Sequence, residues 1–391
     1  MCQNALQEIP AVWQKIQKKQ NKRRQHQTCI ELCLLLSHET ILAHGASLNR
    51  SASFARKRSL RYRYTEKGEL MTNTMNSPWP DPAGVIPVTD GSAEDANVTA
   101  RRYLDSLHVE MRLIDSVKPD LSVTIFQKTY QTPIMMPAFS HLNKNPGNGR
   151  LPMSEYAAAA ADLHTLNWVG MESDETFQEI MKEGADTVRI IKPFADHDRI
   201  RSEMKAAKEA GAAAVGIDID HIAGKDGEYD VVDSIPMGPV LYEDLCSYIR
   251  EADLPFVVKG VLSVSDALKA RDAGAAAVFV SHHHGRVPFG IPPASILPEI
   301  RKALDGSDVA IFCDCSISSG YDAYKALALG ADAVSVGRGI LMPLLKEGRE
   351  GVIRQVTKMN QQLSELCMYT GVPDMKSFDP SVIHIPAAYQ F

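Results

Sequence analysis

A run of three histidines closely followed by an arginine is the segment whose side chains are best suited to catalysis or ligand binding. It reads Ser281-His282-His283-His284-Gly285-Arg286 and follows the apolar residues 278–280. Imidazoles can ligate a metal or move a proton near neutral pH, and a guanidinium can hold an anion. In an extended strand, His282 and His284 share one face and His283 points to the other. The segment therefore predicts a metal site or an acid–base site, with His282 and His284 as rim residues in the second case.

Further polar residues lie at or near the ends of other apolar runs. Lys259 lies within PFVVKG, where a buried ammonium needs an anionic partner. Gly337 and Arg338 end another run, and backbone N–H groups beside a guanidinium suit a terminal phosphate. Together they indicate a phosphorylated cofactor whose reactive ring lies near Lys259. The other polar residues at strand ends are Ser140, Lys192, Asp218, Asp220 and Asp314.

These residues need a framework that brings distant strand ends together. Apolar runs of β type alternate with helical segments from about residue 132, and such runs are typical of a parallel sheet covered by helices. There are eight, at 132–139, 164–171, 186–194, 213–220, 255–261, 276–283, 309–315 and 331–338. Eight units predict a (β/α)8 TIM barrel, in which chemistry takes place at the C-terminal strand ends. An open doubly wound sheet is the alternative, but no G-x-G-x-x-G turn follows the first strand.

A local repeat supports the barrel. The segments KEGADTVRI, EAGAAAVGI, DAGAAAVFV and ALGADAVSV share the order helix end, glycine, small residues, strand. Their glycines suit the left-handed position that ends a helix. We expect this conformation at Gly184, Gly211, Gly274 and Gly330.

The segment PFVVKGVLSVSDALKARDAGAAAVFVSHHHGR resembles a segment of the FMN-dependent α-hydroxy acid dehydrogenase/oxidase family, which includes glycolate oxidase and lactate oxidase. That family has a lysine in a K-G pair on strand 5 and an S-N-H-G-G-R motif on strand 6. It then has D-G-G-[VI]-R-x-G-x-D, K-A-L-A-L-G-A and a G-R pair. This chain has Asp314, Gly320 and Asp322, followed by KALALGADAVSVGR. The resemblance is weak from about residue 90 and strong over 255–352.

The resemblance implies a role for each matching residue. His283 would be the catalytic base, Asp220 would orient it, and Arg286 would hold a substrate carboxylate, with Lys225 as a second substrate contact. Lys259 would contact the flavin, and Asp314 the ribityl chain. The resemblance implies further FMN contacts from Pro137, Ala138, Phe139, Gly170, Lys192, Asp218, Ser281, Ser316, Ser318, Gly337 and Arg338. It implies no metal ligand.

The chain also departs from the family pattern. His282 replaces the asparagine before the catalytic histidine, and His284 replaces a glycine after it. Ser318 stands where a phosphate-binding arginine is expected, and Lys192 where a flavin-contacting glutamine is expected. The substrate tyrosine of strand 3 is Pro193 or Phe194, and the paired tyrosines before the S-G-A segment are absent. The flavin half and the base–arginine pair are thus retained, while much of the substrate half has changed.

Three other interpretations stay open at this point. A metal-dependent hydrolase could use His282 and His284 with Asp314 or a cysteine, but Lys259 and Arg338 then have no purpose. A flavin-dependent isomerase of the same barrel superfamily, such as isopentenyl diphosphate isomerase, keeps FMN without net oxidation. A non-catalytic flavin-binding protein would not need a base with its carboxylate partner. We expect an FMN-dependent oxidoreductase acting on a 2-hydroxy acid or a related carboxylate-bearing alcohol.

Charge divides the chain into unlike parts. The 391 residues carry a net charge of −6, with +8 over residues 1–70 and −14 over the remainder. The acidic balance gives the barrel no sign of nucleic-acid binding. We interpret residues 1–70 as a basic, low-order extension, 71–131 as a lead-in segment and 132–391 as the FMN-binding barrel. The best apolar run of the extension is too short and polar to span a membrane.

The seven cysteines are scattered and match no zinc pattern. Without a secretory signal they indicate reduced thiols and a cytoplasmic protein. The expected partner is a small-molecule carboxylate substrate. The resemblance implies a homo-oligomer, a tetramer in many relatives, and the electron acceptor is not predicted.

Overall fold

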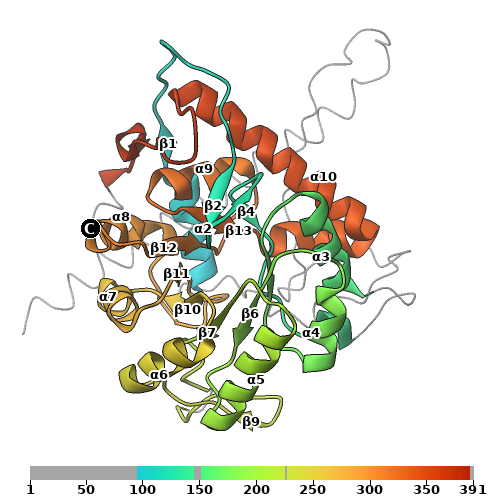
Figure 1. Cartoon of the computed structure of the whole chain (residues 1–391). Helices are drawn as coiled ribbons and strands as arrows, with labels where there is room; N and C mark the ends of the chain where they lie inside the picture. The colour runs from blue at the N-terminus through green and yellow to red at the C-terminus, as the bar shows by residue number, and fades with distance from the viewer. Residues whose placement is uncertain (1–94, 145–150, 225–226, 388–391) are drawn as a thin grey trace, which may run out of the picture. The chain divides into compact units, whose positions relative to one another are not determined.

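The computed structural model describes residues 95–144, 151–224 and 227–387 (Figure 1). The chain divides into two compact units, Met1–Arg61 and Tyr62–Phe391. The predicted basic extension and the first part of the lead-in segment lie outside the described residues. All elements below belong to the second unit.

Eight parallel strands form the centre of this unit. In sheet order they are β4 (Ile134–Met135), β13 (Ala333–Ser335), β12 (Ala310–Cys313), β11 (Ala277–Val280), β10 (Phe256–Val261), β7 (Ala214–Asp218), β6 (Thr187–Ile191) and β5 (Asn167–Val169). A parallel bridge between Phe139 and Val169 joins the two outer strands. The sheet therefore closes into a barrel, and all eight predicted strands are confirmed.

A helix follows each barrel strand, and the helices surround the sheet (Figure 1). They are α3 (Pro152–Asp162), α4 (Asp174–Met181), α5 (His197–Glu209), α6 (Tyr242–Ala252), α7 (Val264–Ala273), α8 (Pro293–Ala303), α9 (Gly320–Ala328) and α10 (Arg338–Thr370). Helix α10 packs against α3 and α9 and is interrupted at Gly348. The four glycines of the repeat have φ between 82° and 116°, so the predicted left-handed helix ends are confirmed. The fold is a (β/α)8 barrel.

Short elements complete the described chain. They are α2 (Ala96–Ser106), β1 (His108–Val109), β2 (Val123–Ile125), β3 (Lys128–Tyr130), η2 (Leu142–Lys144), β8 (Val231–Val232), β9 (Ile235–Pro236), η3 (Pro380–Val382) and β14 (Ile383–His384). Strands β2 and β3 pair with each other, as do β8 and β9, and β1 pairs with β14. None of the helices in the described ranges is long and apolar enough to cross a membrane.

The inside of the barrel is filled by aromatic side chains. Trp168, Phe279 and Phe312 meet edge to face, with ring centroids 5.2–5.9 Å apart. Ile125 and Tyr130 of the β2–β3 hairpin belong to the same buried cluster. Because side chains alternate along a strand, the next inward positions on several strands are polar. Lys259 Nζ lies 6.0 Å from the Phe279 ring centroid, so a polar layer rests directly on the aromatic one.

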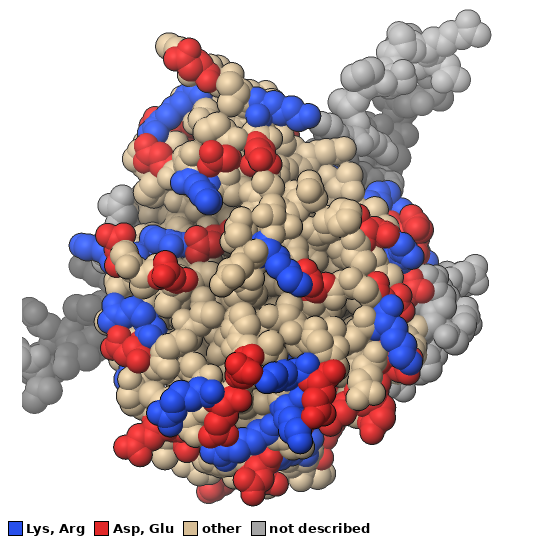
Figure 2. Space-filling view, in the orientation of Figure 1, with Lys and Arg blue, Asp and Glu red and all other residues tan. Residues whose placement is uncertain are grey.

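Charges on the face drawn in Figure 2 are of mixed sign. Lysine and arginine side chains lie among aspartate and glutamate side chains, around a largely uncharged central area. This face carries no continuous basic surface.

Candidate active site

A carboxylate held between two lysines forms the centre of the polar layer. Asp218 Oδ1 lies 2.8 Å from Lys259 Nζ, and Oδ2 lies 2.6 Å from Lys192 Nζ. All three residues are at most 4% exposed. Burial alone would raise the pKa of Asp218, but the two ammonium groups hold it well below its ordinary value. Asp218 is therefore ionised, and it supplies the anionic partner that the sequence required for Lys259.

The two lysines differ in their electrostatic surroundings. Burial lowers the pKa of Lys192, and the nearby Lys259 ammonium adds to this, while Asp218 opposes both. Burial also acts against the charged form of Lys259, but Asp218, Asp220 and Asp314 outweigh it and raise its pKa. Lys259 is thus the firmly cationic member of the pair.

His283 pairs with Asp220 beside this layer. Its Nδ1 lies 2.9 Å from Asp220 Oδ1 and 3.7 Å from Asp218 Oδ1, and its side chain is 21% exposed. The carboxylate Asp220 is nearly buried, and its interactions with His283 hold its pKa low against the effect of burial. His283 and His284 both have positive φ, 43° and 65°. The chain turns sharply here, so the strand geometry expected for the three histidines is wrong for His283 and His284.

Gly260 makes the position of Asp220 sterically possible. It has φ +92°, and a Cβ built at this position would lie 2.6 Å from Asp220 Oδ2. A side chain at position 260 would therefore push Asp220 away from His283. The glycine of the K-G pair thus has a local structural purpose.

Arg286 is connected to the lysines by a chain of polar contacts. Its Nη2 pairs with Asp230 Oδ2, and Asp230 lies 2.9 Å from His221 Nδ1. His221 Nε2 lies 2.8 Å from Lys192 Nζ. Burial and the Lys192 ammonium lower the pKa of His221 to about 3, so this imidazole is neutral. It accepts from Lys192, and its Nδ1 faces both Asp230 Oδ2, at 2.9 Å, and Arg286 Nη2, at 2.7 Å.

Sequence reasoning missed His221 and Asp230. His221 directly follows the predicted Asp220, which was the available signal. Asp230 lies in a loop whose course no pattern in the sequence determines. Lys225, the predicted second substrate contact, lies outside the described residues.

The predicted cofactor residues fall into two groups. The strand ends of β4 and β5 meet where Gly170 N donates to Phe139 O at 2.8 Å, which places Pro137, Ala138, Phe139 and Gly170 side by side. The loop after β12 lies two strands from β4 in the sheet order, beyond β13. There Ser281 Oγ lies 3.6 Å from Cys315 Sγ, and Cys315 Sγ lies 2.9 Å from Asp314 Oδ1.

The ends of β12 and β13 have the donors that a phosphate requires. Helix α10 begins at Arg338 after Gly337, and a Cβ built on Gly337 would meet nothing within 4 Å. A free helix N-terminus beside a guanidinium fits a terminal phosphate. The Ser318 hydroxyl is less available than predicted, because it lies 3.0 Å from Asp322 Oδ2. The backbone carbonyl of Ser316 accepts a hydrogen bond from Arg101 Nη1, and this contact holds the loop in place.

The metal interpretation is not supported. Among the described residues, the group with the spacing of metal ligands is Asp218, His221 and His283, without His282 or His284. The ammonium of Lys192 already contacts two of these ligands, at 2.6 Å and 2.8 Å. The Lys192 ammonium therefore already supplies the positive charge between Asp218 and His221.

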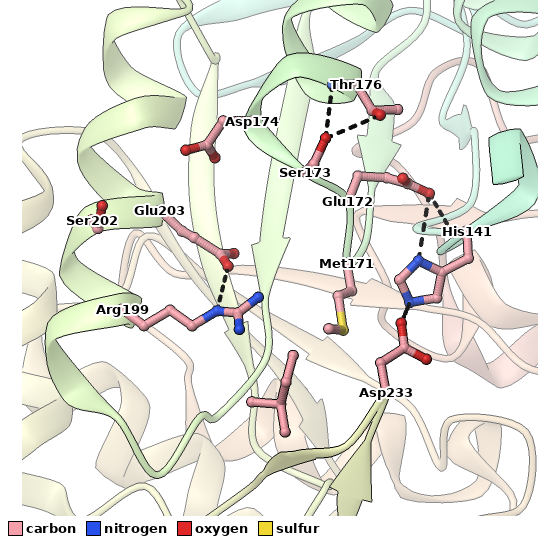
Figure 3. Close-up of a pocket in the computed structure, with 11 residues that line it drawn as sticks. His141, Met171, Glu172, Ser173, Asp174, Thr176, Arg199, Ser202, Glu203 and Asp233 are labelled. Atoms are coloured by element: carbon pink, nitrogen blue, oxygen red, sulfur yellow. Dashed lines mark hydrogen bonds and ion pairs between the residues drawn. The ribbon is translucent and has the colours of Figure 1, made fainter.

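A separate cavity of about 590 Å³ opens between α4, α5 and the β8–β9 hairpin. None of the predicted site residues lines it. In Figure 3, His141 lies between the carboxylates of Glu172 and Asp233, and Arg199 pairs with Glu203. Asp174 of the wall pairs with Arg189, so the carboxylates of the wall have partners, whereas the polar layer of the barrel carries the acid–base pair.

Comparisons with known proteins show the family of this chain. The model of the FMN-dependent dehydrogenase family matches residues 82–245 and 238–385. A peroxisomal (S)-2-hydroxyacid oxidase of Arabidopsis thaliana is 27% identical over 323 residues, which cover 73% of this chain and 87% of that protein. A pre-mycofactocin synthase of Mycolicibacterium smegmatis is 36% identical over 152 residues, covering 39% of this chain and 38% of that protein.

Among solved structures, a mandelate oxidase variant with a monooxide FMN adduct aligns with a TM-score of 0.65 and 26% identity. The alignment covers 75% of this chain and 92% of that chain. The family match spans most of the described residues and includes every strand of the barrel. The chain belongs to the FMN-dependent dehydrogenase family.

Proposed function

We propose that the protein oxidises a 2-hydroxy acid, or a related carboxylate-bearing alcohol, with His283 as the base. FMN is the cofactor of its family, and when bound it accepts the two electrons that leave the substrate. The observation that carries the proposal is the His283–Asp220 pair at 2.9 Å, next to a buried, firmly cationic Lys259 at the mouth of the barrel.

His283 accepts a substrate proton at Nε2. Its Nδ1 faces Asp220, so Nδ1 carries the hydrogen and Nε2 has the free lone pair. Asp220 fixes this tautomer and stabilises the imidazolium that forms after proton transfer. The partial exposure of His283 leaves Nε2 accessible to a small molecule at the barrel mouth.

Arg286 binds the substrate carboxylate. In the structure its Nη2 contacts Asp230, and its Nε lies 3.4 Å from the Asp220 carbonyl oxygen. A carboxylate would therefore meet Nη1 first, and a two-point grip requires the Asp230 contact to open. The affinity of Arg286 for the substrate carboxylate therefore depends on how readily Asp230 releases Nη2.

The remaining predicted residues hold the cofactor. Lys259, which pairs with Asp218, would place a positive charge beside the flavin ring. Pro137, Ala138, Phe139 and Gly170 would line the ring, and Asp314 and Ser281 would contact the ribityl chain. Gly337, Arg338 and the loop of Ser316 and Ser318 surround the phosphate. Residues 132–391 include the barrel that would bind the cofactor.

The experiment that tests this function is anaerobic reduction of the purified protein. Flavin absorbance is followed after mixing with 2-hydroxy acids of increasing side-chain size, and with the matching acids that lack the hydroxyl group as controls. At least one hydroxy acid should bleach the flavin, and no control acid should. If dithionite reduces the flavin but no hydroxy acid does, the proposed substrate class is wrong.

The scattered cysteines and the missing secretory signal favour a cytoplasmic protein. Cys246, Cys313, Cys315 and Cys367, in the described part of the chain, are free thiols. The homo-tetramer is proposed from the family resemblance. Light scattering of the holoprotein tests the mass, and a tagged chain tests the compartment.

A further inference from the structure

One carboxylate oxygen receives two donors at the mouth of the barrel. Oδ2 of Asp230 contacts both Arg286 Nη2 and His221 Nδ1, the latter at 2.9 Å. His221 and Asp230 belong to the segment that follows β7, and Arg286 belongs to the loop that follows β11. The side chains of Asp230 and Arg286 are 15% and 25% exposed. The contact therefore joins two loops at a place that a small molecule can reach.

The tautomer of His221 is fixed from the other side of its ring. Its Nε2 lies 2.8 Å from Lys192 Nζ, and Lys192 is held as an ion pair with Asp218 at 2.6 Å. An ammonium group can only donate, so Nε2 is the acceptor and Nδ1 carries the hydrogen of the neutral ring. His221 is therefore a donor toward Asp230.

Arg286 crowds this donor. Its Nη2 lies 2.7 Å from His221 Nδ1, and a guanidinium nitrogen can only donate as well. This short distance is therefore no hydrogen bond, because it brings two N–H groups together at one oxygen of Asp230. Each donor would bind Asp230 better without the other. The contact between His221 and Asp230 should thus strengthen when Arg286 turns to another anion.

Asp230 keeps partners when it loses Arg286. Its backbone N–H donates to Ile222 O at 2.9 Å, so the chain is held at this point. Its Oδ1 accepts the Val231 N–H at 3.0 Å, and Oδ2 retains His221 Nδ1. A carboxylate without donors would be costly at a partly buried position. Asp230 can therefore release Arg286 by a movement of its side chain alone.

We propose that Asp230 is an internal competitor for the carboxylate site of Arg286, and that His221 is the positioning residue that holds Asp230 after a substrate carboxylate has replaced it. The proposal deepens the proposed function and rests on it for the role of Arg286. One anion takes the place of another on the guanidinium. The exchange occurs beside the base, since the rings of His221 and His283 meet edge to face with centroids 5.0 Å apart.

Two substitutions separate the two nitrogens of His221. In His221→Asn the amide nitrogen replaces Nδ1 and can donate to Asp230. In His221→Gln the amide oxygen reaches the place of Nε2 and keeps the acceptor for Lys192, but no donor stands at the place of Nδ1. Asp230→Asn removes the competing charge. The double variant His221→Gln/Asp230→Asn shows whether His221 acts through Asp230.

Calorimetry of the FMN-loaded proteins measures their affinities for acetate and phenylacetate, which lack the hydroxyl group to be oxidised. We expect Asp230→Asn to bind both acids about tenfold more tightly and His221→Gln about tenfold more weakly, the order of one hydrogen bond to a charged group. His221→Asn should stay within about threefold of the wild type. The loss caused by His221→Gln should disappear in the double variant, because no charged Asp230 remains to be held.

Weaker binding in Asp230→Asn would overturn the proposal, since Asp230 would then orient Arg286 instead of competing for it. An unchanged affinity in Asp230→Asn or His221→Gln would also overturn it. A loss from His221→Gln that persists in the double variant would mean that His221 does not act through Asp230. If the acids bind as expected but no hydroxy acid reduces the flavin, the proposed oxidation is wrong and the internal competitor stands.

A measurement on the unmodified protein covers the case in which a variant does not fold. In spectra of protein with ¹⁵N-labelled histidine, His221 should carry a hydrogen on Nδ1 and none on Nε2. Its Nδ1–H signal should move downfield when acetate or phenylacetate binds. A hydrogen on Nε2 would refute the proposal, because Nδ1 would then accept from Arg286 and could not hold Asp230. A signal that does not move with saturating acid would refute it too.

Discussion

Gly260 and Asp220 are in direct steric contact, and this contact fixes the catalytic pair. A Cβ at position 260 would lie 2.6 Å from Asp220 Oδ2, closer than real side chains approach. Asp220 in turn lies 2.9 Å from His283 Nδ1. The glycine after Lys259 therefore controls the position of the carboxylate that orients the base.

Replacing Gly260 should slow proton transfer without removing the cofactor. In Gly260→Ala the new methyl group displaces Asp220, and His283 loses its fixed tautomer. We expect the rate of flavin reduction by substrate to fall at least tenfold, since general-base catalysis contributes roughly 10²–10⁴-fold. Stopped-flow absorbance measures this rate.

Gly274→Ala is the matched control. Gly274 has nearly the same φ, +96°, but a Cβ there would meet only Ile249 at 3.6 Å. Both variants place an alanine at a positive φ and therefore share the backbone strain. Only Gly260→Ala also displaces Asp220. If the two variants reduce the flavin at the same rate, the steric argument for Gly260 is wrong.

Removing the charge of Asp218 should destabilise the protein. In Asp218→Asn, Lys192 and Lys259 face each other without the carboxylate between them, and breaking a buried pair typically costs about 3 kcal/mol or more of unfolding free energy. Chemical denaturation of the apoprotein at neutral pH measures the difference. A loss below about 1 kcal/mol would mean that water reaches the lysines.

The stability supplied by Asp218 should also depend on pH. Its folded-state pKa is lowered by the two lysines, so its contribution is complete above the pKa of an unfolded aspartate, about 3.9. It is lost as the pH falls below that value toward the folded-state pKa. The gap in unfolding free energy between wild type and Asp218→Asn should therefore narrow below about pH 4. A gap that stays constant down to acid unfolding would exclude this assignment.

Arg286→Lys should weaken substrate binding. A lysine cannot contact Asp230 and a carboxylate in a forked geometry, so we expect KM for a hydroxy acid to rise about tenfold or more. Steady-state kinetics measure the change. Arg354→Lys, which alters an exposed ion pair with Glu347, controls for a general effect of the exchange. Equal KM values in both variants would argue against Arg286 as the carboxylate anchor.

The barrel and its central residues could be predicted because parallel strands place their ends at one mouth. The apolar runs located each strand, and Lys259, Asp220 and His283 then had to lie near one another. The course of the chain beyond the strands could not be predicted. The sharp turn at His283 and the contacts of Asp230 depend on loop conformations. Asn97, which accepts from Arg338 Nη2 at 2.7 Å, reaches the site from α2, a helix outside the barrel repeat. Lys192 and Asp218 were predicted as separate cofactor contacts, but their ion pair became visible only in the folded chain.

The most direct test of the account is the rate of flavin reduction in His283→Asn. The variant is loaded with FMN, mixed anaerobically with the best hydroxy acid substrate of the wild type, and followed by stopped-flow absorbance. Because the variant keeps the barrel, Lys259 and the phosphate site, it should bind FMN as the wild type does. Without a base, its flavin should be reduced at least about 10²-fold more slowly. An FMN-loaded variant that is bleached at the wild-type rate would contradict the assignment of His283 as the base.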